Sequence, residues 1–146
     1  MSEQEHHSGR CLCGAVTVEV TGPLGDISAC HCVPCTRWSG SMQMGIEIPR
    51  DRITVEGPVK TFASSSFAQR AWCDTCGSAL WFADTDGGAP EVLELAPGLF
   101  DNAGGAVLKR VVYADRHPDG YALAGDYISV TKAEYEAKNQ HVEDAP

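Results

Sequence analysis

The sequence has no long apolar run and few basic residues. No apolar stretch approaches the roughly 18 residues that a membrane-spanning helix needs, and residues 1–7 are polar, unlike a signal peptide. The chain carries 11 Lys and Arg against 20 Asp and Glu, for a formal net charge of -9. Because this charge repels phosphate backbones, nucleic-acid binding by charge neutralisation is disfavoured. We therefore expect a cytoplasmic protein that binds neither a membrane nor nucleic acid.

The sequence also lacks a glycine-rich phosphate loop, a local Ser/His/Asp triad motif, and any linker or low-complexity segment that would divide it. A length of 146 residues fits one hydrophobic core. We predict a single zinc-binding domain over residues 10–138, between a flexible N-terminus over residues 1–9 and a flexible tail over residues 139–146.

Short alternating segments separated by turn residues fill most of the chain. Val16, Val18 and Val20 alternate with polar residues, which is the period of a half-buried strand. A capping box of Thr131 and Glu134 starts the one credible helix, which continues to residue 138. These features predict an all-β domain of about ten short strands with a short C-terminal helix. The predicted strands lie at residues 16–21, 42–48, 53–56, 59–62, 67–72, 79–82, 91–95, 107–113 and 127–130, with a turn at 86–88.

Seven cysteines fall into three groups. In a chain without an export signal, such a pattern favours metal binding or catalysis over disulfides. An odd number would also leave one cysteine unpaired in any complete disulfide scheme. The groups are Cys11 with Cys13, then Cys30, Cys32 and Cys35, then Cys73 with Cys76.

The first and third groups predict one structural zinc site. Each supplies two thiolates, and structural zinc usually takes four ligands in a tetrahedron. Each group also ends in a glycine, Gly14 or Gly77, and a turn around a metal often needs the positive φ that glycine adopts easily. We therefore assign Cys11, Cys13, Cys73 and Cys76 to one zinc.

The middle group predicts a second, open zinc site. Cys30, Cys32 and Cys35 supply three thiolates, and three protein ligands with a vacant position are typical of a catalytic zinc. His31 lies between two ligands, so we expect it to point away from the metal and to serve as an acid–base group or a hydrogen-bond donor. Two alternatives stay open. The thiols could form a redox cluster, or a distant Asp115 or His117 could close the site.

The three groups together resemble the glutathione-dependent formaldehyde-activating enzyme family, which also contains the centromere protein V type proteins. The matching motifs are Cys-x-Cys-Gly, then Cys-His-Cys-x-x-Cys followed by Ser-Gly-Ser, then Cys-x-x-Cys-Gly-Ser-Ala-Leu, and they span residues 10–81. The resemblance implies a β-tent fold of short antiparallel strands around zinc, shared with methionine-R-sulfoxide reductases. It also implies two zincs with the same division of the cysteines.

The family resemblance implies a carbon–sulfur lyase that acts on a thiol adduct of a small aldehyde, of the S-hydroxymethylglutathione type. Glutathione is an anionic thiol and would need cationic partners. Arg37 and Arg70 are the nearest cations to the motifs, although each could be a solvated surface charge. Trp38 could form a wall of the pocket or pack as a core or rim residue. The alternative functions are a non-catalytic zinc-stabilised protein-binding module and a thiol redox protein.

Overall fold

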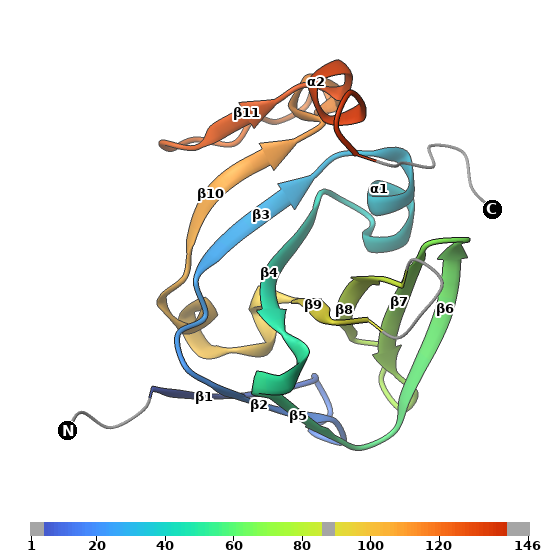
Figure 1. Cartoon of the computed structure of the whole chain (residues 1–146), viewed down its shortest axis with the longest axis vertical. Coiled ribbons are helices and arrows are strands. Elements are labelled where there is room, and N and C mark those ends of the chain that lie inside the picture. Colours follow the sequence, from blue (N-terminus) through green and yellow to red (C-terminus); the bar gives the residue numbers. More distant parts are fainter. Residues whose placement is uncertain (1–4, 86–89, 140–146) are drawn as a thin grey trace.

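Two β-sheets form the fold, which the computed structural model describes for residues 5–85 and 90–139 (Figure 1). The smaller sheet has three antiparallel strands in the order β1-β2-β5. They are β1 (His6–Arg10), β2 (Thr17–Thr21) and β5 (Ile53–Glu56). The Val-rich alternation of β2 produces this strand, because it places one apolar row on the buried face of the small sheet.

The larger sheet has eight strands in the order β11-β10-β3-β4-β9-β8-β7-β6 and is strongly curved (Figure 1). Residues from several of its strands line a hollow. Most neighbours are antiparallel, as expected, but β10 runs parallel to both β3 and β11. Its members are β3 (Asp26–Cys30), β4 (Gln43–Pro49), β6 (Val59–Ser65), β7 (Ala68–Cys73), β8 (Ala79–Asp84), β9 (Val92–Leu95), β10 (Val107–Val112) and β11 (Ile128–Val130).

Two short α-helices accompany the sheets. The predicted C-terminal helix is confirmed as α2 (Lys132–Glu136), and its capping box is present. The helix α1 (Val33–Ser39) was not predicted, because seven residues are too few to show a helical period. It has a proline in its first turn and ends at Gly40, which has the left-handed φ of 82°. Four 3-10 turns complete the elements: η1 (Arg50–Arg52), η2 (Pro97–Leu99), η3 (Asp101–Gly105) and η4 (Ala114–Arg116).

Neither described helix has the length or the apolar run to span a bilayer.

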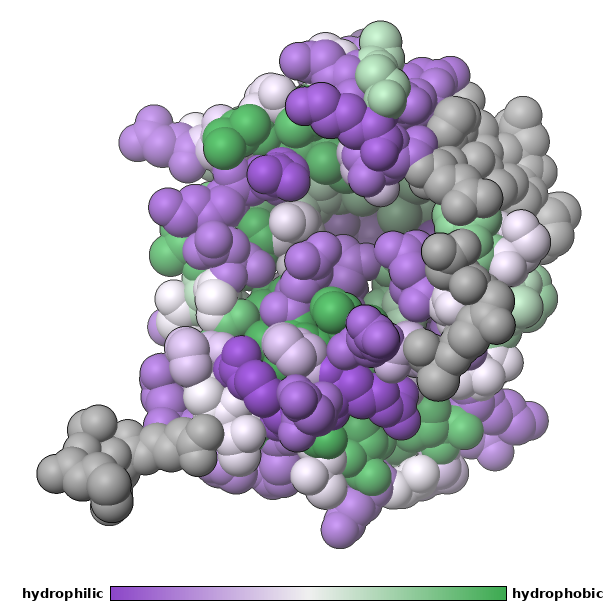
Figure 2. Space-filling view, in the orientation of Figure 1, coloured by the Kyte–Doolittle hydropathy of each residue, from purple (hydrophilic) through white to green (hydrophobic). Residues whose placement is uncertain are grey.

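The hydrophobic core lies between the two sheets, and the opposite face of the large sheet lines the hollow. Ile46 and Ile48 of β4 are fully buried on the core side, together with Val18 of β2. Side chains on a strand alternate between faces, so Gly45 and Glu47 of β4 face the hollow instead. Figure 2 shows hydrophilic residues within this hollow. One face of the large sheet therefore packs in the hydrophobic core, and the other face lines a cavity.

The first strand corrects the predicted N-terminal boundary. Residues 6–9 were expected to be flexible, but they pair with β2, for example His7 with Val20 and Gly9 with Val18. Gly9 obscured this strand in the sequence, because glycine disfavours strands. It is needed here, since a Cβ at Gly9 would lie 2.9 Å from the carbonyl oxygen of Leu99. The strand β3 was also not predicted. The expected turn at 86–88 and the tail beyond residue 139 lie outside the described residues.

Candidate metal centres

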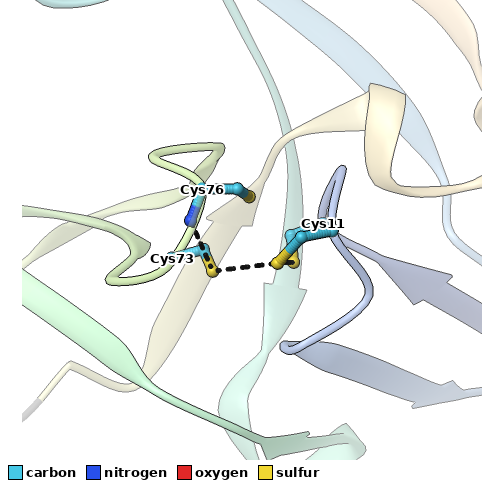
Figure 3. Close-up of side chains that lie close together, drawn as sticks. Cys11, Cys73 and Cys76 are labelled. Carbon is cyan, nitrogen blue, oxygen red and sulfur yellow. Dashed lines mark hydrogen bonds between the residues drawn. The ribbon is translucent and has the colours of Figure 1, made fainter.

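Four cysteines from two distant segments meet beside the core. Cys11 and Cys13 lie in the loop after β1, whereas Cys73 and Cys76 lie at the end of β7 and in the following turn. Figure 3 shows the sulfur atoms of Cys11, Cys73 and Cys76 turned toward one another. All four Sγ atoms lie within 4.8 Å of one another, with 3.6 Å between Cys11 and Cys13 and 3.9 Å between Cys13 and Cys73.

This four-cysteine cluster fits a zinc ion. A tetrahedron with Zn–S bonds of about 2.3 Å separates its sulfurs by about 3.8 Å, close to the observed distances. Backbone N–H groups point at the sulfurs, from Val16 to Cys11 at 3.3 Å and from Cys76 to Cys73 at 3.4 Å. Such hydrogen bonds offset the negative charge of the thiolates. Hydrogen bonds from the hydroxyl and backbone N–H of Ser78 lower the pKa of the Cys76 thiol to about 5.

The glycines that follow each cysteine pair have the predicted role. Gly14 has a φ of 80° and Gly77 a φ of 81°, a conformation that L-residues with side chains rarely adopt. Each turn thereby closes back on its own cysteines: the N–H of Gly14 donates to the carbonyl of Cys11, and that of Gly77 to the carbonyl of Cys73. The sequence signal for this site was therefore local backbone geometry as well as ligand spacing.

The other three cysteines meet at the junction of β3 and α1. Cys30 ends β3, Cys32 is the N-cap of α1, and Cys35 is buried within that helix. Their Sγ atoms also lie within 4.8 Å of one another. No fourth His, Cys, Asp or Glu from residues 5–85 or 90–139 joins this group, and neither of the two distant candidates, Asp115 and His117, belongs to it. The three thiols fit a metal site with one position open to a ligand from outside the chain.

The electrostatics of the three-cysteine cluster also favour a cation. The pKa of Cys32 is lowered to about 3, first because the thiols of Cys30 and Cys35 hydrogen-bond to its sulfur. The same hydrogen bond to Cys32 raises the pKa of Cys30, and burial raises it further. The three thiols therefore resist becoming thiolates at the same time. A divalent cation would be needed to ionise all three.

The three-cysteine cluster opens into a cavity of about 700 Å³. Strands β3, β4, β9, β8 and β7 provide its floor, and α1 and α2 provide part of its walls. Figure 2 shows the molecule hollowed here. The ionisable side chains that line it are the thiols Cys30, Cys32 and Cys35, the carboxyls Glu47, Asp84, Glu94 and Glu134, the cations Arg70, Arg110 and Lys138, and the phenols Tyr113 and Tyr135.

Arg70 is a predicted site residue that lines the cavity and is buried. Its side chain is only 3% exposed, and its Nη2 donates to the Sγ of Cys35 at 3.7 Å. Its Nη1 donates to the Oε1 of Gln43, and its guanidinium lies 4.9 Å from the centroid of the Phe82 ring. Arg70 therefore offsets charge on the cysteine cluster, and its burial excludes the alternative of a solvated surface charge.

Arg37 and Trp38 do not line the cavity. Arg37 is exposed on α1. Trp38 stacks on Phe62 with a centroid distance of 6.1 Å and an interplanar angle of 4°. Its ring also lies 5.5 Å from Trp72 and 5.9 Å from the guanidinium of Arg70. Trp38 thus packs α1 onto β6 and β7 at the rim of the sheet, which agrees with the rim alternative.

His31 faces away from the three-cysteine cluster. Neighbouring residues along an extended chain point to opposite sides, so His31 enters a separate pocket of about 220 Å³, which His117 and Tyr127 also line. It is 2% exposed, and neither ring nitrogen has a hydrogen-bond partner in the described part of the chain. Burial, and then the charge of His117, lower its pKa. The structure therefore does not bring His31 into the cavity as an acid–base group.

Glu94 is a cavity residue that the sequence reading missed. It lies on β9 between Glu47 of β4 and Phe82 of β8, its partners across the strands. Burial raises its pKa to about 8, and the charges of Glu47 and Asp84 contribute to the increase. The signal was present in the sequence, since Glu94 is a lone charge between Leu93 and Leu95, both buried in the core.

Tyr113 and Tyr135 also reach the cavity, although the sequence reading gave them no role. Tyr113 follows β10 with a φ of 53°, which is unusual for a residue with a side chain. Its ring packs on Tyr135 with a centroid distance of 5.3 Å. Strained backbone at a cavity is a common feature of functional sites. No local pattern marks either residue, because their proximity to the cysteines depends on how β10 and α2 pack.

Comparisons with known proteins agree with this architecture. Residues 6–115 match the family described as glutathione-dependent formaldehyde-activating enzyme. An uncharacterized lyase of Schizosaccharomyces pombe is 33% identical over 119 residues, which cover 81% of this chain and 85% of that protein. A crystal structure of a Rhodobacter sphaeroides protein has the same fold, with a TM-score of 0.54 and 20% identity over 70% of this chain and 99% of the other. The chain belongs to the glutathione-dependent formaldehyde-activating enzyme family.

Proposed function

We propose that this protein is a zinc-dependent carbon–sulfur lyase that acts on a thiol adduct of a small aldehyde, of the S-hydroxymethylglutathione type. The observation that carries this proposal is the three-cysteine cluster, which opens into the large cavity without a fourth ligand from the described chain. A metal site that served only to stabilise the fold would be expected to be closed, as the four-cysteine cluster is. Family membership and the lyase-named relative support the same class of enzyme.

Both cysteine clusters fit zinc, and we assign them different roles. Cys11, Cys13, Cys73 and Cys76 would hold a structural zinc that links the N-terminal loop to the end of β7. Cys30, Cys32 and Cys35 would hold the zinc of the active site. When bound there, zinc supplies Lewis acidity that stabilises a substrate sulfur as thiolate or polarises the aldehyde oxygen.

The reaction breaks the carbon–sulfur bond, and it needs one proton to be removed from the hydroxyl and one to be supplied to the sulfur. In the lyase direction the hydroxyl of the S-hydroxymethyl group loses its proton, and the oxygen's electron pair forms the carbonyl. The carbon–sulfur bond breaks, and the sulfur leaves with the electron pair of that bond and takes up a proton. No oxidant or reductant is needed. Glu94 is suited to accept the hydroxyl proton, because a carboxyl with a pKa of about 8 exchanges protons near neutral pH.

The remaining polar residues of the cavity would bind and orient the adduct. The guanidinium of Arg70 donates hydrogen bonds to Cys35 and Gln43, so it would stabilise negative charge on the cysteine cluster. The substrate's carboxylates would then bind to other groups. Arg110 of β10 and Lys138, just after α2, are the further cations of the cavity. They would pair with the carboxylates of glutathione or of a similar anionic thiol.

The test measures zinc content and turnover together. We expect gently purified protein to carry two zincs per chain, one of which a mild chelator removes. The two-zinc protein should release formaldehyde from S-hydroxymethylglutathione well above the spontaneous rate, and the one-zinc protein should not. A protein with two zincs and no acceleration for this adduct, or for adducts of other thiols, would refute the lyase proposal in favour of a zinc-stabilised binding module.

A further inference from the structure

The helix α2 forms a wall of the cavity that lies outside the family match. The match ends at residue 115, whereas α2 (Lys132–Glu136) follows the last strand. Glu134 and Tyr135 of α2 line the same cavity as Cys30 and Cys32. In Figure 1 this helix lies at the end of the molecule where β10 and β3 finish and α1 begins. Its side chains are therefore additions to the site that the family motifs do not describe.

Hydrogen bonds to the rest of the chain hold this short helix in place. The capping box joins the Oγ1 of Thr131 to the N–H of Glu134 at 3.2 Å, and the N–H of Thr131 to a carboxylate oxygen of Glu134 at 3.0 Å. The N–H of Lys132 donates to Asp115 at 2.8 Å. A five-residue helix would not be stable in isolation, so these contacts position the side chains that face the cavity.

The phenol of Tyr135 is available to a ligand, whereas that of Tyr113 is not. The hydroxyl of Tyr113 donates to Glu136 at 3.0 Å, which anchors α2. The hydroxyl of Tyr135 has no hydrogen-bond partner among the residues that the structure describes. Burial raises the pKa of Tyr135 to about 12, with further contributions from Cys30 and Glu94. Tyr135 lines the same cavity as Cys30, Cys32 and Glu94, the carboxyl that we propose accepts the proton. The raised pKa keeps its phenol neutral.

We propose that the hydroxyl of Tyr135 donates a hydrogen bond to the aldehyde-derived oxygen of the adduct and stabilises the alkoxide that forms before the carbon–sulfur bond breaks. This inference rests on the proposed lyase function. The phenol keeps its own proton throughout: the adduct's hydroxyl proton passes to Glu94, and the sulfur takes a proton from solvent. A neutral donor held near developing negative charge is a common means of stabilising a transition state.

The first test replaces one hydroxyl and leaves the ring in place. Tyr135→Phe should lower kcat for S-hydroxymethylglutathione breakdown roughly 100-fold, as expected for loss of one oxyanion donor, with KM changed less than about twofold. Zinc content and Tm should match the wild type, since this hydroxyl contributes no hydrogen bond within the described chain. The matched control is Tyr121→Phe, which should leave kcat unchanged because Tyr121 is not among the residues that line the cavity and its ring centroid lies 6.1 Å from that of His31.

A second test measures binding without turnover. The zinc-loaded protein is titrated by calorimetry with 2-mercaptoethanol and with 1-propanethiol, which have nearly the same shape but differ in the hydroxyl. We expect the wild type and Tyr121→Phe to bind 2-mercaptoethanol about fivefold to tenfold more tightly, the effect of one net hydrogen bond. Tyr135→Phe should bind both thiols equally.

The two tests separate failure of this inference from failure of the lyase proposal. An active wild type with an equally active Tyr135→Phe would overturn the role of Tyr135 and leave the lyase function standing. An inactive wild type would overturn the lyase function. In that case the binding experiment still tests the role of Tyr135. If wild type and Tyr135→Phe prefer 2-mercaptoethanol over 1-propanethiol to the same degree, the phenol does not recognise the oxygen.

Discussion

The two cysteine clusters differ in how completely the chain surrounds the sulfur atoms. The four-cysteine cluster receives all of its ligands from two turns, and backbone N–H groups point at its sulfurs. The three-cysteine cluster receives three ligands, a guanidinium from Arg70 and an open side that faces the cavity. Four thiolates complete a zinc tetrahedron and three do not. Under the proposed function, the closed cluster would serve stability and the open cluster would serve the reaction.

The largest contrast is expected between Cys76→Ser and Cys32→Ser. Loss of a structural zinc ligand removes folding free energy, because the metal site does not exist in the unfolded chain. Cys76→Ser should therefore abolish the cooperative melting transition. Cys32→Ser should reduce formaldehyde release to the spontaneous rate and shift Tm by less than about 5 °C. Circular dichroism melts and the turnover assay measure the pair, and a Cys76→Ser protein with wild-type melting would show that the roles are assigned wrongly.

The next effect concerns proton transfer at the open site. If the carboxylate of Glu94 accepts the hydroxyl proton, the rate of adduct breakdown should rise with pH through about 8. Glu94→Gln should lose roughly 100-fold in kcat and lose this dependence on pH. Glu47→Gln is the matched control. It removes a charge that raises the pKa of Glu94, so the rise in rate should move to lower pH while activity remains. An unchanged pH–rate profile in Glu94→Gln would exclude its role.

The raised pKa of Glu94 also predicts how the stability of the protein depends on pH. The pKa of Glu94 is higher in the folded protein, about 8, than its ordinary value of 4.5. The folded state then binds a proton that the unfolded state has released, so the free energy of unfolding should fall as pH rises from 4.5 to about 8. Glu94→Gln lacks this contribution, and its Tm should exceed that of the wild type more at pH 8.5 than at pH 5.

The smallest expected effect is a difference in zinc affinity between the two cysteine clusters. Arg70 offsets the charge of Cys35 at the three-cysteine cluster, and we find no side-chain cation hydrogen-bonded to a sulfur of the four-cysteine cluster in the described chain. Arg70→Lys cannot reproduce the guanidinium fork, so zinc should bind the open site about tenfold more weakly. Competition with a chromogenic chelator measures this, with Arg37→Lys as the exposed control. Equal weakening of both zincs would mean that Arg70 supports the fold as a whole.

Some of the architecture could be predicted because it follows from local patterns. The all-β class is confirmed, since alternation in segments such as residues 16–21 sets one face of a strand against the core. The short helix after Thr131 is confirmed because a capping box acts within four residues. The strand β1 and the helix α1 were missed. Gly9 hides the first, and seven residues are too few to reveal the second.

The sequence by itself determined which sulfurs come together. The seven cysteines meet in the two groups that the sequence indicated, and each pair of the four-cysteine cluster lies in a tight turn that ends in Gly14 or Gly77. Tertiary structure alone decided what surrounds the open cluster. Glu94, Arg70 and Tyr135 reach its cavity from β9, β7 and α2, and His31, just after β3, enters the other pocket. These positions depend on strand order and on which face each side chain takes, and long-range packing of the sheet sets both.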